Sequence, residues 1–243
     1  MNAAIEFLPP KRQRAITRSD FVHFALLMLL ACGGCGEPTP QAPPVKLDLS
    51  SLTSQAESGD PKAQSALGRA YMEGSGTSRN YQKAAEWLGR AADQTNVESM
   101  VHLAMLHQVG QGVPQSDAKA LHWFQQAYAL SNAVAAYSLG SIYANGRGVP
   151  QNSTTAARYY QTAADWGDPE AQYNMAQRYE LGRGVQTNLL EALVCYELAA
   201  KGGVPDAKAP ATRLRDVCSP KERAAADSKI DAALFRLRRL KSQ

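Results

Sequence analysis

Apolar residues recur along most of the chain at intervals of three and four positions, which places their side chains on one face of an α-helix. Ala63, Leu67 and Tyr71 follow this spacing, and Leu88 and Ala91 continue it after a polar break. The pattern predicts one helix, a loop and a second helix. It is found three more times further along the chain.

The pattern has a fixed period of 36 residues. Among the positions that keep this step are Leu67, Leu103, Leu139 and Met175, and Ala84, Ala120, Ala156 and Ala192. A fixed period of about 20 to 50 residues is typical of solenoids, in which each unit buries its apolar face against its neighbours. We therefore predict an all-α solenoid of helix-turn-helix repeats over residues 59–203, divided into 59–94, 95–130, 131–166 and 167–202.

Residues with strong preferences for helix ends occupy the same places in every repeat. Asp, Asn and Ser side chains accept hydrogen bonds from the first N–H groups of a helix, and glycine ends helices because it adopts the left-handed conformation without steric cost. The predicted N-caps are Asp60, Asn96, Asn132 and Asp168 for the first helices, and Asn80, Ser116, Asn152 and Asn188 for the second. The first helices are predicted to end at Gly74, Gly110, Gly146 and Gly182.

A second glycine stands two residues after each of these, so every inter-helix loop contains a glycine pair. Glycine pairs also occur in dinucleotide-binding loops, but that motif follows a strand. Here a helix precedes the pair each time. We therefore predict that the pairs turn the chain and bind no phosphate.

Both ends of the repeat array carry further helical patterns. Residues 47–58 correspond to a second helix and its exit turn, which predicts an N-terminal capping helix. In the C-terminal segment 204–243, residues 206–217 correspond to a first helix, and Ser219 with Glu222 then marks the start of a closing helix. We expect this closing helix to cover the last exposed apolar surface with Ile230, Leu234 and Leu237.

Residues 1–31 differ from the rest of the chain. A basic stretch precedes an apolar run at 21–31, which fits a signal-peptide core and is too short for a helix to span a bilayer. Leu29-Leu30-Ala31-Cys32 resembles the bacterial lipobox, in which cleavage precedes a cysteine that carries the lipid anchor. We expect 1–31 to be a lipoprotein signal peptide and Cys32 to be lipidated, with palmitate among its acyl chains; an ordinary secretory signal and an uncleaved anchor are the alternatives.

The Pro- and Gly-rich residues 32–46 have the composition of an extended, unstructured tether. Such a tether would hold the repeats away from a lipid surface. In Gram-negative bacteria, lipoproteins of this kind proceed to the outer membrane. We therefore expect a protein of the bacterial envelope, anchored by its N-terminal lipid in the outer membrane and facing the periplasm.

The repeats themselves resemble a known family. Residues 136–167, AYSLGSIYANGRGVPQNSTTAARYYQTAADWG, and residues 171–202 are similar to the Sel-one-like repeat, a relative of the tetratricopeptide repeat with a longer inter-helix loop. The resemblance covers about residues 59–203. It implies a right-handed α/α superhelix and a role in protein interaction, and it does not name the partner.

The first helices of tetratricopeptide-like arrays line the concave wall, so the resemblance implies a binding surface there. One helical stripe, away from the face of Leu67 and Tyr71, mixes methionine, tyrosine, arginine and glutamine, which suits an extended peptide or a protein ligand. Packing is the alternative for the tyrosines, and plain solvent exposure for the rest. The predicted partner-binding residues are Lys62, Arg69, Met72, Glu98, Met105, Gln108, Tyr137, Ser141, Tyr173, Gln177 and Glu180.

Composition and side-chain chemistry narrow the function further. The formal net charge is +4, which argues against a general nucleic-acid-binding protein. His102 and His107 lie five positions apart, and residues must be about four apart to share a helix face, so no metal site is predicted. We expect no cofactor, and a monomer in solution.

Ser116 and Lys119 match the Ser-x-x-Lys of penicillin-recognising serine enzymes. Ser116 is already explained as an N-cap and the companion motifs are missing, so we predict an interaction scaffold and no enzyme. An envelope hydrolase acting on β-lactam or cell-wall substrates is the alternative from another class. A secreted effector directed at a host is a third.

Two features of the C-terminal part remain. Cys195 and Cys218 would be exported, where disulfides persist, so we expect a bridge between them; two buried free thiols are the alternative. The basic residues of 235–241 suit a solvated helix terminus, or contact with anionic lipid or a cell-wall polymer.

Overall fold

The computed structural model of the chain describes residues 49–241, which lie in one compact unit of residues 47–243. The predicted signal peptide, Cys32 and the tether lie outside the described residues. No helix among the described residues is long and apolar enough to cross a membrane. The described elements are α2 (Leu49–Glu57), α3 (Pro61–Glu73), α4 (Tyr81–Asp93), α5 (Val97–Val109), α6 (Asp117–Ala129), α7 (Ala133–Asn145), α8 (Ser153–Asp165), α9 (Pro169–Leu181), α10 (Leu189–Lys201), η1 (Pro205–Ala207), α11 (Lys208–Val217) and α12 (Pro220–Lys241).

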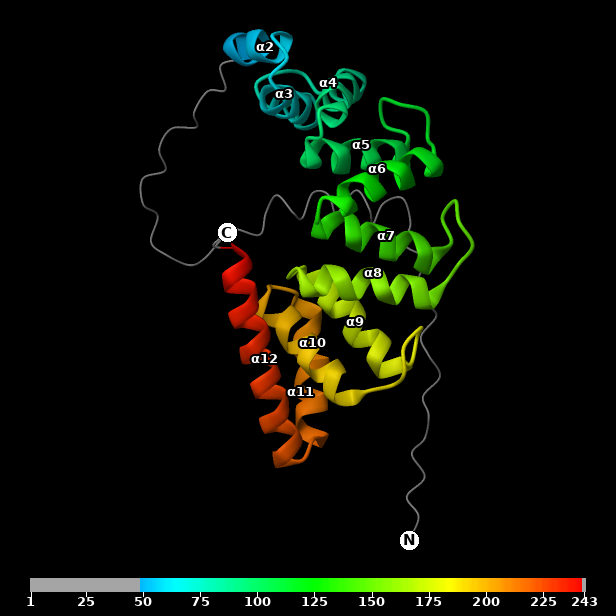
Figure 1. The fold of residues 1–243 in the computed structure, drawn as a ribbon, viewed down its shortest axis with the longest axis vertical. Coiled ribbons are helices and arrows are strands. Elements are labelled where there is room, and N and C mark those ends of the chain that lie inside the picture. Colours follow the sequence, from blue (N-terminus) through cyan, green and yellow to red (C-terminus); the bar gives the residue numbers. More distant parts are fainter. Residues whose placement is uncertain (1–48, 242–243) are drawn as a thin grey trace, which may run out of the picture. The chain divides into compact units, whose positions relative to one another are not determined.

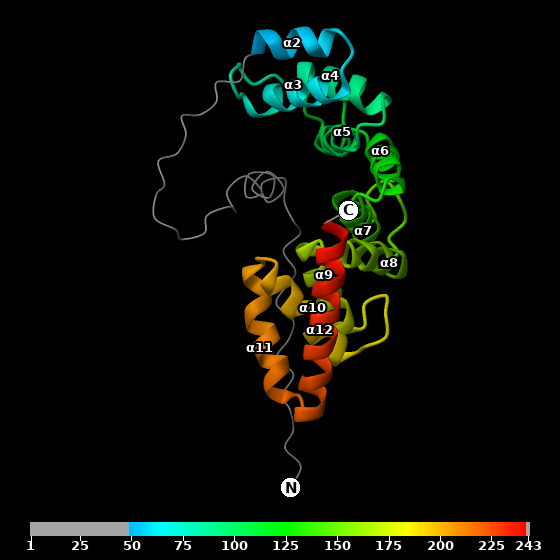
Figure 2. The same cartoon turned by 60° about the vertical axis from the view of Figure 1, so that its left-hand side comes forward.

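Helices alternate between two roles. We call α3, α5, α7 and α9 the A helices and α4, α6, α8 and α10 the B helices. Each A helix packs on the B helix of its own repeat and on the helix before it in the chain, and the pairs follow one another along the long axis of the unit (Figure 1). In Figure 2, α6 and α8 lie at the right-hand edge, with α5, α7 and α9 to their left. The predicted all-α solenoid of four repeats is confirmed.

The helix ends form as the sequence predicts. All eight predicted N-cap side chains accept a hydrogen bond from a backbone N–H two or three residues further on. The A helices end at glycines with φ between 68° and 78°, the left-handed region that other residues rarely adopt. Each cap glycine N–H donates to a carbonyl of the last turn, which fixes the direction in which the loop leaves the helix.

In the second, third and fourth repeats, the second glycine of the loop has a different role, because it contacts the preceding repeat. A Cβ on Gly112 would lie 2.2 Å from the backbone of Tyr81, at the start of α4. A Cβ on Gly184 would lie 2.1 Å from the carbonyl oxygen of Ser153, at the start of α8. The glycine pair therefore combines a helix stop with a close backbone contact between neighbouring repeats.

Within a repeat, the A and B helices approach closely where a small residue faces a large one. A Cβ on Gly68 in α3 would lie 2.6 Å from Cγ of Leu88, which is fully buried in α4. A Cβ on Gly140 in α7 would lie 2.8 Å from the ring of Tyr160 in α8. These contacts keep the helix pairs tightly packed, and most of the remaining core positions are alanines and leucines.

The C-terminal cap differs from a fifth repeat. Ser219 and Glu222 form the predicted capping box, with the Ser219 N–H donating to the Glu222 carboxylate at 2.8 Å. Helix α12 then packs along α10 (Figure 1) and buries Ile230, as predicted. Its Leu237 reaches the turn between α8 and α9, where a Cβ on Gly167 would lie 2.8 Å from the leucine side chain.

Ion pairs join the cap to the last repeat. The Arg215 guanidinium of α11 contacts the carboxylates of Glu197 at 2.5 Å and Asp227 at 2.6 Å, and so connects α10, α11 and α12. Lys229 of α12 pairs with Glu191 of α10. The cap is thus held by apolar contacts on one face and by charge pairs at its edges.

Candidate protein-binding surface

The eleven residues predicted to bind a partner lie on the four A helices, and we call them the A-helix surface. Lys62, Arg69 and Glu98 are exposed, whereas Gln108 is buried, with 7% of its surface exposed. The others are partly buried: Met72, Met105, Tyr137, Ser141, Tyr173, Gln177 and Glu180. Ten of the eleven positions therefore expose part of their side chain, and contact with a partner stays a prediction for all of them.

In the first two repeats, one ion pair dominates this surface. The Arg69 guanidinium of α3 contacts the Glu98 carboxylate of α5 at 2.7 Å, and both side chains are about half exposed. An exposed pair of this kind contributes at most about 1 kcal/mol. Burial lowers the pKa of the neighbouring His102, and Glu98 offsets part of that effect. The side chains at this end of the surface are therefore charged, and they can change conformation at little cost in free energy.

In the last two repeats, the surface is built from aromatic pairs. Tyr137 of α7 lies against Tyr160 of α8 with ring centroids 5.5 Å apart, and Tyr173 of α9 lies against Tyr196 of α10 at 5.7 Å. Burial is the largest cause that raises the pKa of Tyr137 and of Tyr196 above the ordinary value. These hydroxyls therefore stay protonated at neutral pH and can donate hydrogen bonds.

Glu180, at the end of α9, has a structural role. Its carboxylate accepts a hydrogen bond from the Tyr196 hydroxyl at 2.9 Å and pairs with the Arg213 guanidinium of α11 at 2.6 Å. It therefore joins the last repeat to the cap.

Sequence reasoning missed several residues that complete the surface. Tyr160 and Tyr196 come from B helices, and the Arg178 guanidinium lies 4.8 Å from the Tyr160 ring centroid. One signal was available: earlier repeats have Leu88 and Phe124 at the same repeat position as these tyrosines. A hydroxyl at a buried position needs a hydrogen-bond partner, and the change of residue type marks where polar groups enter the core.

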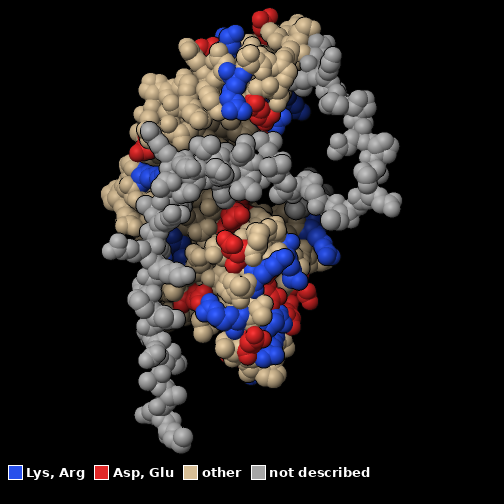
Figure 3. All heavy atoms as spheres, turned by 180° about the vertical axis from the view of Figure 1, so that it is seen from behind, with Lys and Arg blue, Asp and Glu red and all other residues tan. Residues whose placement is uncertain are grey.

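Charges of both signs are interleaved on the described part of the face shown in Figure 3, where lysine and arginine side chains lie among aspartate and glutamate. A nucleic-acid-binding face would show a continuous basic area. The described part of this face therefore carries both signs of charge.

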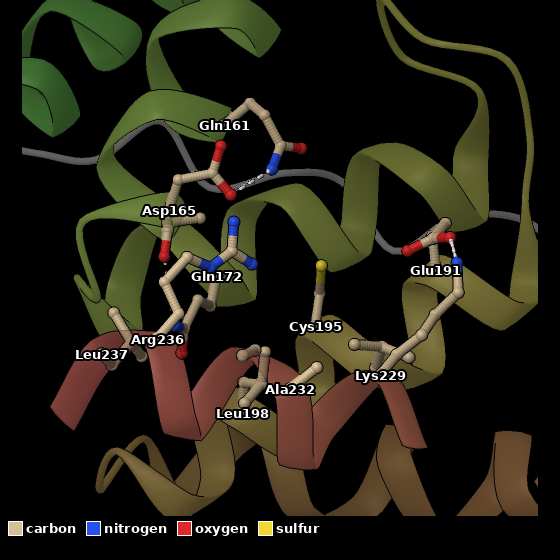
Figure 4. A pocket seen from close by; sticks show the side chains of 13 residues that line it. Gln161, Asp165, Gln172, Glu191, Cys195, Leu198, Lys229, Ala232, Arg236 and Leu237 are labelled. Atoms are coloured by element: carbon tan, nitrogen blue, oxygen red, sulfur yellow. Dashed lines mark hydrogen bonds and ion pairs between the residues drawn. The ribbon is translucent and has the colours of Figure 1, made fainter. Parts of the chain in front are cut away.

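A second feature lies on the B-helix side. A pocket of about 310 Å³ lies between α8, α10 and α12, with Cys195, Lys229, Arg236 and Asp165 among its lining residues (Figure 4). The three earlier repeats carry Trp87, Trp123 and Tyr159 at the position of Cys195. In repeat 3 the Tyr159 ring packs against Tyr128 of the preceding repeat, at 5.2 Å between centroids. In repeat 4 the smaller cysteine side chain leaves a space unfilled, and α12 covers this space.

The bridge predicted between Cys195 and Cys218 is not present, because both are free and buried thiols in the structure. Glu197 of α10 faces Arg215 of α11, whereas Cys195 lies two residues away, about 200° around the helix. Its thiol therefore points into the pocket of Figure 4, toward Gln161 and Asp165 of α8. Burial raises the pKa of the Cys195 thiol to about 12, so it is a poor nucleophile at neutral pH.

The Ser-x-x-Lys match has a structural explanation. The Ser116 hydroxyl accepts a hydrogen bond from the Lys119 N–H at 3.3 Å and caps α6, as predicted. Among the described residues, no three His, Cys, Asp or Glu side chains lie close enough together to hold a metal ion.

Comparisons with known proteins agree with this architecture. The Sel1 repeat model matches four consecutive segments, residues 61–96, 97–132, 133–168 and 169–204. A Sel1 repeat protein from Oxalobacter formigenes is similar in structure, with a TM-score of 0.60 and 26% identity over 67% of this chain and 67% of that one. No curated protein matches the chain.

A second solved structure is similar in fold. It is a protective antigen of uropathogenic Escherichia coli strains, with a TM-score of 0.52 and 21% identity. The match covers 79% of this chain and 50% of the antigen, so this chain spans half of the antigen's length.

Proposed function

The chain belongs to the Sel1 repeat family, and from this premise we propose that it is an interaction scaffold of the bacterial envelope, which binds a protein or peptide on its A-helix surface. Sel1 repeat proteins generally mediate protein–protein interactions, and their repeats typically form a non-enzymatic scaffold. The location, the partner and the residues involved are our proposal.

One observation carries the choice of surface: the A helices of all four repeats present partly exposed side chains of the kinds that interfaces use. Tyrosine, methionine and arginine are enriched in protein interfaces. Met72, Met105, Tyr137 and Tyr173 each come from a different repeat, so the same surface continues across the array. This continuity favours an extended segment of a partner over a single pocket.

The surface is also held in place before binding. Tyr137 and Tyr173 each pack against a second tyrosine from the B helix of the same repeat, and Gly140 lets Tyr160 approach α7 closely. Side chains that are already ordered lose little conformational entropy when a partner binds. The mechanism we propose is therefore geometric: a rigid helical wall presents aromatic and polar groups in a fixed array.

Photo-crosslinking tests the surface. A photoreactive amino acid at Met105 or Gln177, both on the A-helix surface, is expected to give adducts of higher mass in cells that make the protein. The matched controls are Gln125 of α6 and Arg158 of α8, which are exposed on B helices. Mass spectrometry of the adducts would identify the partner. Adducts at the two control positions alone would contradict the proposed surface.

The envelope location rests on the signal-like residues 1–31 and on Cys32. We expect labelled palmitate to be incorporated into the protein, and Cys32→Ser to abolish the label and release the protein from the membrane fraction. Label retained in Cys32→Ser would refute the lipid attachment at this residue. Such a result would leave the A-helix surface proposal untouched.

A further inference from the structure

The last two turns of α12 carry an exposed surface that is both basic and apolar. We call Phe235, Arg236, Arg238, Arg239 and Leu240 the α12 tip. All five residues are exposed, with 64% of Phe235 and 49% of Leu240 accessible. Four of them, all except Arg238, line a shallow hollow of about 260 Å³ that involves no other residue. The two large apolar side chains of the tip, Phe235 and Leu240, therefore border the same hollow.

Helix geometry explains why this patch faces outward. Leu237 packs on the turn at Gly167 and so fixes the inner face of the helix end. Phe235 lies two residues from Leu237, about 200° around the helix, and therefore points away from the repeats. The packing of Leu237 thus presents the aromatic ring to solvent.

The charge of the tip has one sign. No acidic residue occurs between Ala232 and Leu240 in the sequence, and Arg236 also lines the pocket of Figure 4, together with Asp165 of α8. Three arginines thus flank two exposed apolar side chains. Arginine binds phosphate oxygens through a planar fork of N–H donors, whereas phenylalanine and leucine gain by leaving water.

We propose that the α12 tip docks on the surface of an anionic phospholipid bilayer. The three arginines contact lipid phosphates, while Phe235 and Leu240 enter the boundary between headgroups and acyl chains. A soluble polyanion would use the arginines and leave the two apolar side chains in water. The joint presence of both kinds of side chain is what selects the bilayer.

Docking at this point would add to the proposed function without depending on it. The tip lies on α12, beside the turn between α8 and α9, and the A-helix surface lies on other helices, so lipid could be contacted at the tip while a partner is bound along the A helices. The lipid contact would orient the array relative to the membrane. It can be tested on a chain that lacks the N-terminal segment, because all described hydrophobic clusters lie in the unit 47–243.

The test is co-sedimentation of residues 47–243 with vesicles at low salt. We expect binding to phosphatidylcholine vesicles that contain 30% phosphatidylglycerol, and no binding to pure phosphatidylcholine. Because a basic residue near an anionic membrane is worth about a factor of five, R236Q/R238Q/R239Q should lower the partition coefficient about 100-fold. The control K119Q/R158Q/R183Q removes the same charge from exposed positions in the repeats and should bind like the parent.

A second variant tests the apolar part of the proposal. Phe235→Ser should weaken vesicle binding roughly fivefold, since part of a phenylalanine side chain no longer leaves water. It should leave any binding to polyphosphate, a soluble polyanion, unchanged. Circular dichroism at 222 nm checks that each variant keeps its helices.

Three results would overturn the proposal: no sedimentation with the anionic vesicles, an equal loss in the control K119Q/R158Q/R183Q, or Phe235→Ser binding like the parent. The last result, combined with tight binding to polyphosphate, would assign the tip to a soluble anionic polymer. None of these results bears on crosslinking at the A-helix surface, so the two proposals fail separately.

Discussion

The backbone at Gly184 has a φ of 77°, and the nearest atom to a Cβ there would be the carbonyl oxygen of Ser153, one repeat earlier. Two requirements therefore exclude a side chain at this residue: the left-handed conformation and the close contact with the neighbouring repeat. The first is visible from a single repeat. The second exists only when repeats stack.

We predict that Gly184→Ala lowers the free energy of unfolding by about 2–4 kcal/mol, the sum of left-handed strain and overpacking against backbone. Gly89→Ala is the matched control, because Gly89 lies inside α4 with no atom within 4 Å of its Cβ position. This second change should stabilise the protein by about 0.5–1 kcal/mol. Urea unfolding followed at 222 nm measures the stability of both variants. Similar unfolding midpoints for the two variants would contradict the close contact at Gly184.

Because Cys195 is buried, its thiol makes the stability of the protein depend on pH. Its thiol keeps its proton up to about pH 12 in the folded chain, whereas an ordinary thiol releases it near pH 9. Between these values the unfolded state binds fewer protons than the folded state. The stability contributed by the neutral thiol is therefore fully present below pH 9 and is lost as the pH rises toward 12.

We expect Cys195→Ala to make the loss of stability above pH 9 shallower, by up to about 1.4 kcal/mol per pH unit for one proton. Buried tyrosines act in the same direction, so the comparison with the parent isolates the thiol. Urea unfolding at pH 8.5, 9.5 and 10.5 measures the slope. An unchanged slope would show that the thiol titrates normally in the folded protein.

At the scale of elements, α12 is the part that departs from the repeat pattern. It covers the pocket beside Cys195, where the earlier repeats have an aromatic ring. Ile230, on the same helix, has only 3% of its surface exposed. Sequence periodicity identified the apolar face of this helix. It did not show that the helix runs back as far as the turn at Gly167.

Ile230→Asp is predicted to detach α12, because an unpaired charge would be buried at a cost of more than about 3 kcal/mol. In a Cys218→Ala variant of residues 47–243, Cys195 should then react with a thiol reagent at least about tenfold faster. Asp231→Ala, at the exposed next position, should leave the rate unchanged. Equal rates in Ile230→Asp and its parent would mean that α12 does not protect the thiol.

At the largest scale, the described unit is organised by contacts between successive helices, since each A helix packs on the helices on either side of it in the chain. Stability in such an array is close to a sum of repeat and interface contributions. The described unit should therefore tolerate the loss of one complete period, because Asn132 can take the capping position of Asp168 and Gly184 can meet Asp117 in place of Gly148.

Deletion of residues 133–168 is predicted to leave a folded array of three repeats, with unchanged helix content per residue and a lower unfolding midpoint. Deletion of 133–150 is the control, because it removes α7 and leaves α8 without its A helix. This shorter deletion should cause loss of helix or aggregation. Circular dichroism with thermal unfolding distinguishes the outcomes, and a coil spectrum for the longer deletion would contradict additive stacking.

Much of the fold was predictable because each boundary is set by a local preference. The N-caps, the glycine stops and the capping box at Ser219 form as predicted, since each depends on a few neighbouring residues. The candidate surface was predictable in part. Helical spacing identified Tyr137 and Tyr173, but Glu180 is engaged by Tyr196 and Arg213, which lie 16 and 33 residues further along the chain.

The sequence by itself determined that the described part of this chain folds into four stacked helical hairpins, because period, caps and apolar spacing act over short distances in the chain. Only the tertiary structure decided which side chains meet across repeats. It showed that the second glycines contact the preceding repeat, that B-helix tyrosines support the A-helix surface, and that Cys195 faces α8 instead of Cys218. These contacts depend on how the helices are rotated and packed, and a periodic pattern fixes only which face is buried.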